Sequence, residues 1–315
     1  MADYSEFHAE LRSVAGDVLA KERAVEWAVL VDAGWVGLEV PEHLGGAGAT
    51  FAEVAVICEE MGRATSATSF LGGAVLAVGV LNALAPSHTR DQLLSGLASG
   101  AARVAVAVEP FDFVPDAEGA DAVLVVVDGG VALATVTVTP QPVLDETRRL
   151  ARVTVETTSE VLPFEDPDSA VRRLHDRAAV AIACDSLGVA EAMLAATVAY
   201  VKVRHQFDRP IGSFQAVKHA CADMYVGIAV SRQLVDAAVH AVANDRPDAA
   251  VAAAMAKSYA CSTAVDVAGK AMQLHGGIGY TWESGIHVYL KRAALNRSLF
   301  GSPAAHRHEL AQRYL

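Results

Sequence analysis

Residues 204–219 combine side chains that can hold an anionic ligand. This stretch begins at Arg204 and contains a second arginine, Arg209, five residues later. An arginine presents a rigid fork of N–H donors that matches the oxygens of a phosphate group. The residue types alone leave another interpretation open, in which both arginines are surface charges.

Residues 273–283 form a second stretch whose residue types can contact a ligand. The amide of Gln273 can bond to polar groups of a ligand, and the pair Gly276-Gly277 has no side chains. Backbone at paired glycines can approach a ligand closely. Glycines also end helices, so a simple helix stop is the alternative for this pair.

Long helical patterns surround both stretches. Apolar residues recur at helical spacing, with Ser213 and Asp248 as the expected N-caps of the second and third helices. The expected helices cover about residues 170–203, 213–243, 248–274 and 285–297. Long antiparallel helices joined by short turns predict a helical bundle.

The sequence pattern of the first hundred residues also predicts helices. Thr50 followed by Glu53 predicts a capping box at a helix start. Residues 70–85 are apolar but too short to span a bilayer, and we expect a buried core helix there.

Between these helical parts lie four valine-rich segments bounded by Asp, Gly and Pro. We expect strands at residues 103–108, 122–127, 131–138 and 151–156, paired antiparallel because no helix separates them. The predicted fold is therefore mainly α with a small β domain. Its expected parts are an N-terminal helical domain (1–101), a shortened middle β domain (102–165) and a C-terminal helical bundle (166–315).

Composition limits the possible partners. The chain has 315 residues, 53% of them hydrophobic, and a formal charge of −12, which is typical of a well-packed globular protein and argues against nucleic acid. The four cysteines lie far apart without metal-ligand spacing, so buried free thiols and no metal site are expected. No basic-then-apolar leader opens the sequence, which predicts a cytoplasmic protein with no membrane partner.

The two C-terminal stretches together resemble the flavin-dependent acyl-CoA dehydrogenases. Residues 34–48 and 59–63 are also similar to the first helical domain of that family. In the family, FAD lies across a subunit boundary: one subunit's β domain holds the flavin ring, and its neighbour's bundle holds the pyrophosphate and adenosine end. The resemblance implies that this second half of the FAD site contains Arg204, Phe207, Gln215, Gln273, Gly276 and Gly277.

The sequence departs from the family where the flavin ring is normally held. The expected Thr-Glu-Pro loop is reduced to Glu109-Pro110 without the threonine, and no tryptophan occurs between Trp35 and Trp282. The resemblance therefore implies that the ring-binding half of the site is missing from residues 102–165.

The general base is the second departure. The resemblance places the family's usual carboxylate at Gly301, and the alternative position used by some relatives at Ala178. Neither residue can accept a proton. Asp176 is the remaining weak candidate, but two residues along a helix turn a side chain by about 200°. We therefore expect no catalytic residue in this chain.

These features resemble the short, degenerate subunit of the heterotetrameric acyl-CoA dehydrogenases that act on sterol side chains in actinobacteria. The resemblance implies a full-length homologous partner, a two-plus-two assembly and a bulky acyl-CoA substrate such as a steroid thioester. Two alternatives stay open. One is a self-sufficient homomeric dehydrogenase that uses Asp176 or another carboxylate, and the other is a non-catalytic scaffold that only stabilises its partner or binds CoA compounds.

Overall fold

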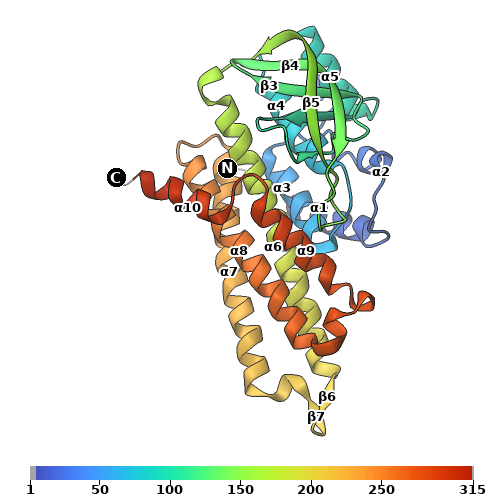
Figure 1. The fold of residues 1–315 in the computed structure, drawn as a ribbon, viewed down its shortest axis with the longest axis vertical. Helices are drawn as coiled ribbons and strands as arrows, with labels where there is room; N and C mark the ends of the chain where they lie inside the picture. The colour runs from blue at the N-terminus through green and yellow to red at the C-terminus, as the bar shows by residue number, and fades with distance from the viewer. Residues whose placement is uncertain (1–4, 314–315) are drawn as a thin grey trace. The chain divides into compact units, whose positions relative to one another are not determined.

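The computed structural model describes residues 5–313, which are mostly helical with a small sheet (Figure 1). Contacts divide the chain into two units. The first comprises Met1–Arg23, Cys58–Ser66 and Ile182–Leu315, and the second comprises Ala24–Ile57 and Ala67–Ala181. The long helix α6 (Pro167–Val203) supplies residues to both.

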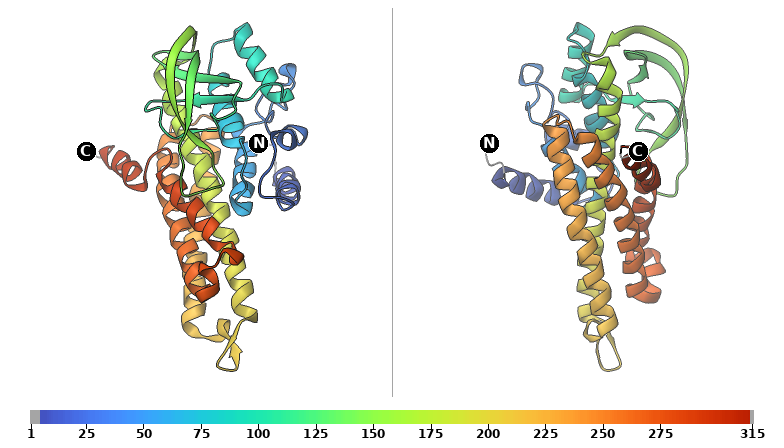
Figure 2. Two further views of the ribbon diagram at one scale, coloured as in Figure 1. Left: turned by 45° about the vertical axis from the view of Figure 1, so that its right-hand side comes forward. Right: turned by 90° about the vertical axis from the view of Figure 1, so that its left-hand side faces the viewer.

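The helical bundle lies in the first unit. Besides the later part of α6, it contains α7 (Gln215–Ala243), α8 (Ala249–His275), α9 (Ile286–Ser298) and α10 (Pro303–Gln312). Helices α7 and α8 run side by side in both views of Figure 2. Gly227 of α7 lies opposite Thr263 of α8, where an added Cβ would come within 3.1 Å of Thr263 Cγ2. The bundle predicted from the sequence is confirmed, whereas α10 was not predicted.

The N-terminal helices are α1 (Ser5–Leu19), α2 (Trp27–Asp32), α3 (Phe51–Ala64), α4 (Val78–Asn82) and α5 (His88–Ser99). The capping box at the start of α3 is confirmed, since the Thr50 N–H donates to Glu53 Oε2 (2.8 Å). The apolar stretch 70–85 is buried and helical, but its first part, Leu71–Ala77, is a π-helix. Arg177 Nε donates to the Val75 carbonyl of this segment (2.6 Å), which satisfies an acceptor in the irregular turn.

The strands are β1 (Val104–Ala107), β2 (Val114–Pro115), β3 (Ala122–Val127), β4 (Gly130–Pro140) and β5 (Leu150–Pro163). They form a five-stranded sheet of order β1-β3-β4-β5-β2, and β3, β4 and β5 pair antiparallel as expected. The all-antiparallel prediction is wrong for β1, which pairs parallel with β3. The connection 108–121 is long enough to make the crossover that a parallel pair needs.

The two expected helix caps have different outcomes. The cap expected at Ser213 is wrong, because residues 211–213 form a separate 3-10 turn and the Ser213 hydroxyl donates to the Pro210 carbonyl (2.7 Å). Asp248 is the N-cap residue of α8 as expected, but its carboxylate pairs with Arg246 (2.9 Å) and makes no capping hydrogen bond. The boundaries proposed after residues 101 and 165 stay predictions, and residues 1–4 and 314–315 of the outer domains lie outside the described part.

Two helices, α6 and α7, are long and apolar enough to cross a membrane by length and composition alone. The most apolar window of α6 is 78% buried inside the protein, as in the core helix of a folded domain. The four cysteines carry no disulfide, and Cys58, Cys184 and Cys261 are buried as expected, whereas Cys221 is half-buried. Burial raises the pKa of the Cys184 thiol well above its ordinary value.

Candidate functional site

The end of α6 leads into a tight hairpin. Strands β6 (His205–Gln206) and β7 (Arg209–Pro210) pair antiparallel around Phe207 and Asp208, whose φ angles are 55° and 62°. Two successive residues with positive φ fit a two-residue hairpin loop, but a phenylalanine rarely adopts this conformation. The Phe207 side chain is also 86% exposed. A strained and exposed aromatic residue is a typical mark of a binding site.

Neighbouring side chains hold the hairpin in place. The Ile211 N–H donates to the Arg204 carbonyl (2.8 Å), which closes the hairpin at its base. The guanidinium of Arg209 lies 4.1 Å from the ring centre of Phe214, and the rings of Phe207 and Phe214 meet edge to face at 6.1 Å. Arg209 thus has a packing role, whereas the Arg204 side chain is exposed.

The end of α8 has the second motif. Gly276 ends the helix with φ 63° and ψ −143°, a conformation that glycine alone adopts readily. An added Cβ at Gly276 or Gly277 would meet no atom within 4 Å. The packing of the chain therefore does not require these two residues to lack side chains, and the open space beside them fits a ligand that approaches the backbone from outside. The Gln273 side chain next to them is exposed.

The structure brings the two motifs to one end of the bundle. The rings of Tyr200 and His275 stack with their centres 4.4 Å apart, and Tyr200 Oη donates to the His275 carbonyl (3.3 Å). Gln215, the first residue of α7, belongs to the same end, because α7 and α8 are antiparallel with Gly227 opposite Thr263. An arginine, two amide side chains and a pair of glycines thus gather at one exposed end of the bundle.

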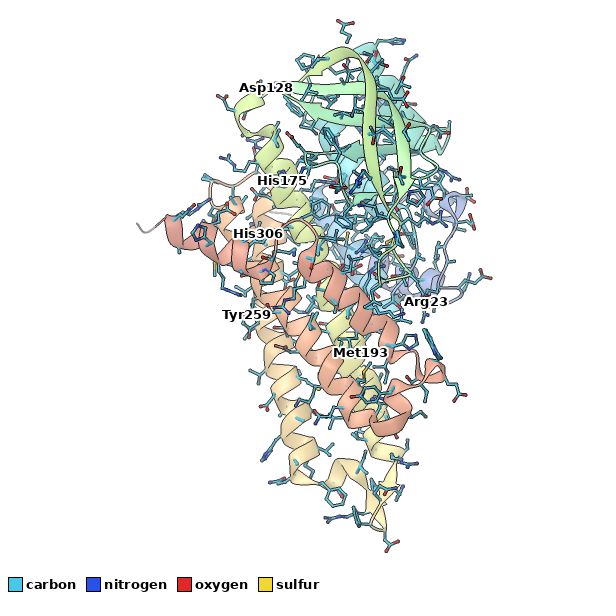
Figure 3. The ribbon with its side chains drawn as sticks, viewed as in Figure 1. Arg23, Asp128, His175, Met193, Tyr259 and His306 are labelled. Carbon is cyan, nitrogen blue, oxygen red and sulfur yellow. The ribbon has the colours of Figure 1, made fainter. Side chains whose placement is uncertain are left out.

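The base position has a different environment. Gly301 lies at the corner between α9 and α10 with φ 95°, next to Phe300 with φ 53°. The Nε2–H of His306, on α10 (Figure 3), donates to the Phe300 carbonyl (2.9 Å). A Cβ added at Gly301 would come within 2.7 Å of His306 Nε2. The space in which a side chain at position 301 would begin is therefore filled by an imidazole.

A buried lysine fixes the same corner from the other side. Lys257 of α8 is fully buried, and its ammonium donates to the carbonyls of Asn296 and Gly301, both at 2.9 Å. Burial lowers the pKa of Lys257. The ammonium group of Lys257 satisfies the Asn296 carbonyl in the last turn of α9 and interacts favourably with the dipole of that helix. Lys257 was not predicted as part of this corner, because a single lysine in an alanine-rich helix has no distinctive sequence pattern.

The second inherited base position lies on α6, in the other unit. Ala178 is fully buried, whereas Asp176 is partly exposed, so the two residues face different surroundings. Ala178 has no group that can take a proton.

The loop expected near the flavin ring is closed by internal contacts. Asp112 accepts from Arg152 Nε (2.6 Å) and from Gln141 Nε2 (3.2 Å), and the amide oxygen of Gln141 accepts from the Phe113 N–H (2.6 Å). These polar groups bind one another at an exposed surface.

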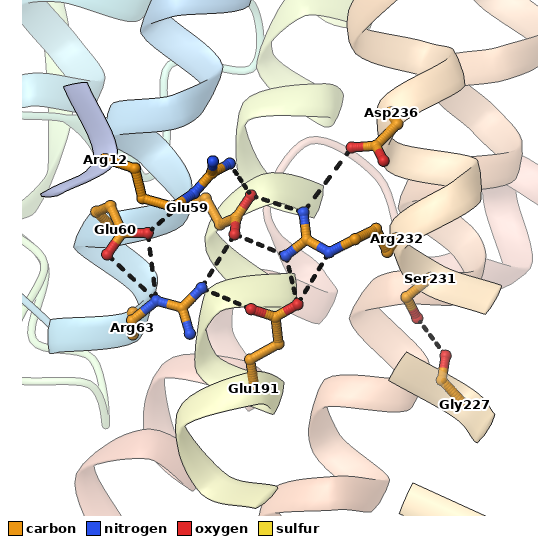
Figure 4. Close-up of polar contacts among 9 residues, drawn as sticks. All are labelled: Arg12, Glu59, Glu60, Arg63, Glu191, Gly227, Ser231, Arg232 and Asp236. Carbon is orange, nitrogen blue, oxygen red and sulfur yellow. Dashed lines mark hydrogen bonds and ion pairs between the residues drawn. The ribbon is translucent and has the colours of Figure 1, made fainter. Parts of the chain in front are cut away.

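A charged cluster ties together helices of the first unit (Figure 4). Arg232 donates to Glu59 (2.7 Å) and contacts Glu191, and Arg63 contacts the same two carboxylates at 3.1 and 2.5 Å. Arg12 approaches Glu59 at 3.4 Å. Burial alone would raise the pKa of Glu59, but the hydrogen bond and charge of Arg232, with Arg12 and Arg63, outweigh burial and lower it.

A second buried ion pair supports α9. Both oxygens of Asp185 accept from Arg292, from Nε at 3.0 Å and from Nη2 at 2.6 Å, with neither side chain more than 4% exposed. Asn296 Nδ2 donates to the same carboxylate (2.6 Å). Among residues 5–313 no group of His, Cys, Asp or Glu is arranged to hold a metal ion. These clusters are positioned to stabilise the bundle.

Comparisons with known proteins agree with the fold. The family model described as the acyl-CoA dehydrogenase N-terminal domain matches residues 5–101, and the model of the C-terminal domain of the same family matches residues 169–315. The acyl-CoA dehydrogenase IpdE2 of Mycobacterium tuberculosis is 41% identical over 279 residues, covering 88% of this chain and 82% of the relative. IpdE2 of Mycolicibacterium smegmatis is 37% identical over 280 residues, covering 88% and 84%.

Solved structures give the same result. A variant of the Tcur3481–Tcur3483 steroid ACAD superposes with a TM-score of 0.87 at 26% identity, covering 98% of both chains. Butyryl-CoA dehydrogenase from Megasphaera elsdenii superposes with a TM-score of 0.86 over 100% of this chain and 99% of its own, and at 19% identity it supports the fold alone. This layout of N-terminal helices, middle sheet and C-terminal bundle confirms the predicted fold. The chain belongs to the acyl-CoA dehydrogenase family.

Proposed function

We propose that this chain is the non-catalytic subunit of a heteromeric, FAD-dependent acyl-CoA dehydrogenase of the cytoplasm. A homologous full-length subunit supplies the flavin-ring half of each site and the general base. This chain supplies the half that binds the pyrophosphate and adenosine. The assembly is a two-plus-two heterotetramer that introduces an α,β double bond into an acyl-CoA thioester.

The observation that carries the proposal is the exposed end of the bundle. Arg204 is exposed there, Phe207 is 86% exposed, and added Cβ atoms at Gly276 and Gly277 would meet open space. Arg204 is the group that would bind phosphate oxygens, while Gln273 and Gln215 would bond polar groups of the adenosine end. When bound, FAD supplies the acceptor for the β-hydride of the substrate.

The rest of the chain supports a subunit that needs a partner. The loop near the expected ring position is closed by the bonds among Asp112, Gln141 and Arg152. Removal of the α-proton needs a group that can take it, and both inherited positions, Gly301 and Ala178, lack one. The imidazole of His306 would also have to shift to admit a side chain at Gly301.

The names of the relatives support a bulky substrate and a partner. One solved relative is the Tcur3481-Tcur3483 steroid ACAD. A further solved relative is a complex of ChsE4 and ChsE5 from Mycobacterium tuberculosis. We therefore propose a steroid side-chain CoA thioester as the substrate class of the assembly.

Co-expression tests the division of labour. The chain is produced together with a full-length acyl-CoA dehydrogenase homologue, and dehydrogenation of acyl-CoA esters is followed with a dye as electron acceptor. Changing the partner's carboxylate base to an amide should abolish turnover, since loss of a general base costs roughly 10²–10⁴-fold. Asp176→Asn should leave turnover within a few-fold at equal flavin content. An inactive, fully flavin-loaded Asp176→Asn complex would show that this chain provides the base.

A further inference from the structure

A lysine and a cysteine are buried together inside the helical bundle. Lys257 and Cys261 lie four positions apart on α8, and both residues are fully buried. Side chains at this spacing are neighbours on a helix, and the amine and the thiol form a hydrogen bond. The Sγ atom of Cys261 also lies 3.3 Å from the hydroxyl oxygen of Ser186 on α6. The two groups are therefore held in contact, and the proposed FAD half-site uses neither of them.

The surroundings of this pair favour the transfer of a proton. The ammonium of Lys257 donates to the carbonyls of Asn296 and Gly301, and within residues 5–313 it forms no ion pair with a carboxylate. Burial without a counter-charge disfavours the charged form and lowers the pKa of Lys257. Burial also raises the pKa of Cys261, which by itself would keep this thiol unreactive. The neighbouring amine offsets this effect, because it can take the thiol proton when the sulfur reacts.

The pair lies beneath the corner between α9 and α10. Gly301 is exposed at this corner, and its carbonyl accepts from Lys257 Nζ (2.9 Å). The preceding residue, Phe300, has a φ of 53°, which is a strained conformation for phenylalanine. Hydrogen peroxide is little larger than water, so a local opening of this short corner is enough to admit it to the thiol.

We propose that Lys257 and Cys261 form a reversible sulfenamide cross-link when the protein meets hydrogen peroxide. The Cys261 sulfur attacks the peroxide, the O–O bond breaks, and a sulfenic acid and one water form. The Lys257 nitrogen then attacks this sulfur, which forms the N–S bond and releases a second water. One ammonium, one thiol and one peroxide thus give one N–S bond, two waters and one proton. The sulfur is oxidised by two electrons and the peroxide is reduced, so neither flavin nor a partner subunit takes part.

The cross-link would change the corner that Lys257 holds. A sulfenamide nitrogen carries one hydrogen, whereas the carbonyls of Asn296 and Gly301 both accept from Lys257 in the reduced protein. One of these carbonyls therefore loses its donor, and the end of α9 loses the positive charge that favours its dipole. We expect faster amide hydrogen exchange in residues 299–303 after oxidation.

Peptide mapping of the peroxide-treated protein tests the proposal. The folded chain is exposed to hydrogen peroxide, denatured, alkylated and digested with trypsin in the absence of a reductant. Trypsin cleaves after a free lysine, so the cross-link should abolish cleavage after Lys257. The uncleaved peptide should have lost two hydrogen atoms, and Cys261 should resist alkylation. Treatment with dithiothreitol before alkylation should restore both the cleavage and the reactive thiol.

Two variants and two other thiols serve as controls. Cys261→Ser keeps the size of the side chain, and trypsin should cleave this variant after Lys257 with or without peroxide. Lys257→Arg keeps the positive charge but not the amine, so Cys261 should stop at the sulfenic acid, which dimedone captures. Cys184 is buried and Cys221 is half-buried, and their oxidation in the same digest shows how far peroxide reaches.

The peroxide concentration is raised until Cys221 is oxidised. Cleavage after Lys257 that persists while Cys261 carries added oxygen overturns the cross-link, and so does a Cys261 that stays unmodified at this point. A peptide that has lost two hydrogens but gained one oxygen would show an oxygen bridge between the two side chains and would overturn the direct N–S bond. None of these results bears on the proposed function, which the flavin content of the co-expressed complex tests separately.

Discussion

The ring of His275 lies stacked on the ring of Tyr200, with their centres 4.4 Å apart and their planes at 22°. This pair joins the last turn of α8 to the last turn of α6. The Arg204 hairpin begins one turn beyond Tyr200, and Gly276 follows His275 directly. This stacking and the hydrogen bond from Tyr200 Oη to the His275 carbonyl therefore connect, at one end of the bundle, two motifs that are about seventy residues apart in the sequence.

Removing this contact should loosen the proposed FAD half-site. We expect Tyr200→Ala to weaken FAD binding by the co-expressed complex several-fold, because a stacked aromatic pair contributes about 0.5–1.5 kcal/mol beyond burial. Tyr200→Phe keeps the ring and loses only the hydroxyl, so it should bind nearly as wild type. Fluorescence titration with FAD measures both variants, and equal affinity for Tyr200→Ala and wild type would contradict the argument.

Arg204→Ala should release FAD without unfolding the complex. Loss of a charge-assisted bond to phosphate costs roughly 1.5–3 kcal/mol, or about one to two orders of magnitude in affinity. Arg246→Ala is the control, because Arg246 is an exposed arginine in the turn between α7 and α8, paired with Asp248 (2.9 Å). Unchanged FAD affinity of the Arg204→Ala complex, determined by equilibrium dialysis, would remove Arg204 from the site.

Glu59→Gln should destabilise the isolated chain by about 1–3 kcal/mol, because it leaves partly buried arginines short of a carboxylate. The folded pKa of Glu59 lies below its ordinary value of 4.5, so on acidification the unfolded chain takes up the proton first. The contribution of Glu59 is then fully present above about pH 4.5 and is lost as pH falls through the folded pKa.

Urea unfolding of both chains at a series of pH values measures this difference. The gap in unfolding free energy between wild type and Glu59→Gln should narrow below pH 4.5. A gap that is constant with pH would show that the charge of Glu59 does not stabilise the cluster.

Gly301→Glu should not restore a working base. The positive φ at this position costs an L-residue roughly 1–3 kcal/mol, and the new Cβ would lie 2.7 Å from His306 Nε2. Thermal unfolding should show a loss of stability, and the co-expressed complex should gain no turnover when the partner's own base is removed. A stable Gly301→Glu chain that rescues such a complex would contradict this reading of the corner.

A double-mutant cycle identifies the cause of that loss. Gly301→Ala should cost less stability in a His306→Ala background than in the wild type, because the imidazole no longer overlaps the added methyl group. The loss of stability that remains in the His306→Ala background is caused by the positive φ angle of residue 301.

Much of the fold was predictable because local signals and the global fold agree. The Thr50–Glu53 capping box and the apolar face of α3 depend on residues a few positions apart, and both are present. The pairing of β1 was not predictable in this way. Whether it lies parallel or antiparallel to β3 depends on the path of residues 108–121, and that path follows from tertiary packing.

The proposed site was partly visible in the sequence. The residue types around Arg204 and Gly276 and their family resemblance marked the two motifs, but their proximity depends on the stacking of Tyr200 on His275. The environment of Gly301 between α9 and α10 could not be predicted from the sequence. It depends on Lys257 and His306, which approach from different helices and form no pattern along the chain.

Flavin content per chain is the most direct test of the central claim that this chain holds only half of an FAD site. The isolated chain and the co-expressed complex are purified in excess FAD, and bound flavin is quantified by absorbance after denaturation, with subunit ratios from native mass spectrometry. We predict almost no flavin on the isolated chain and one FAD for each full-length partner in a two-plus-two complex. A stoichiometric flavin spectrum from the isolated chain would contradict the account.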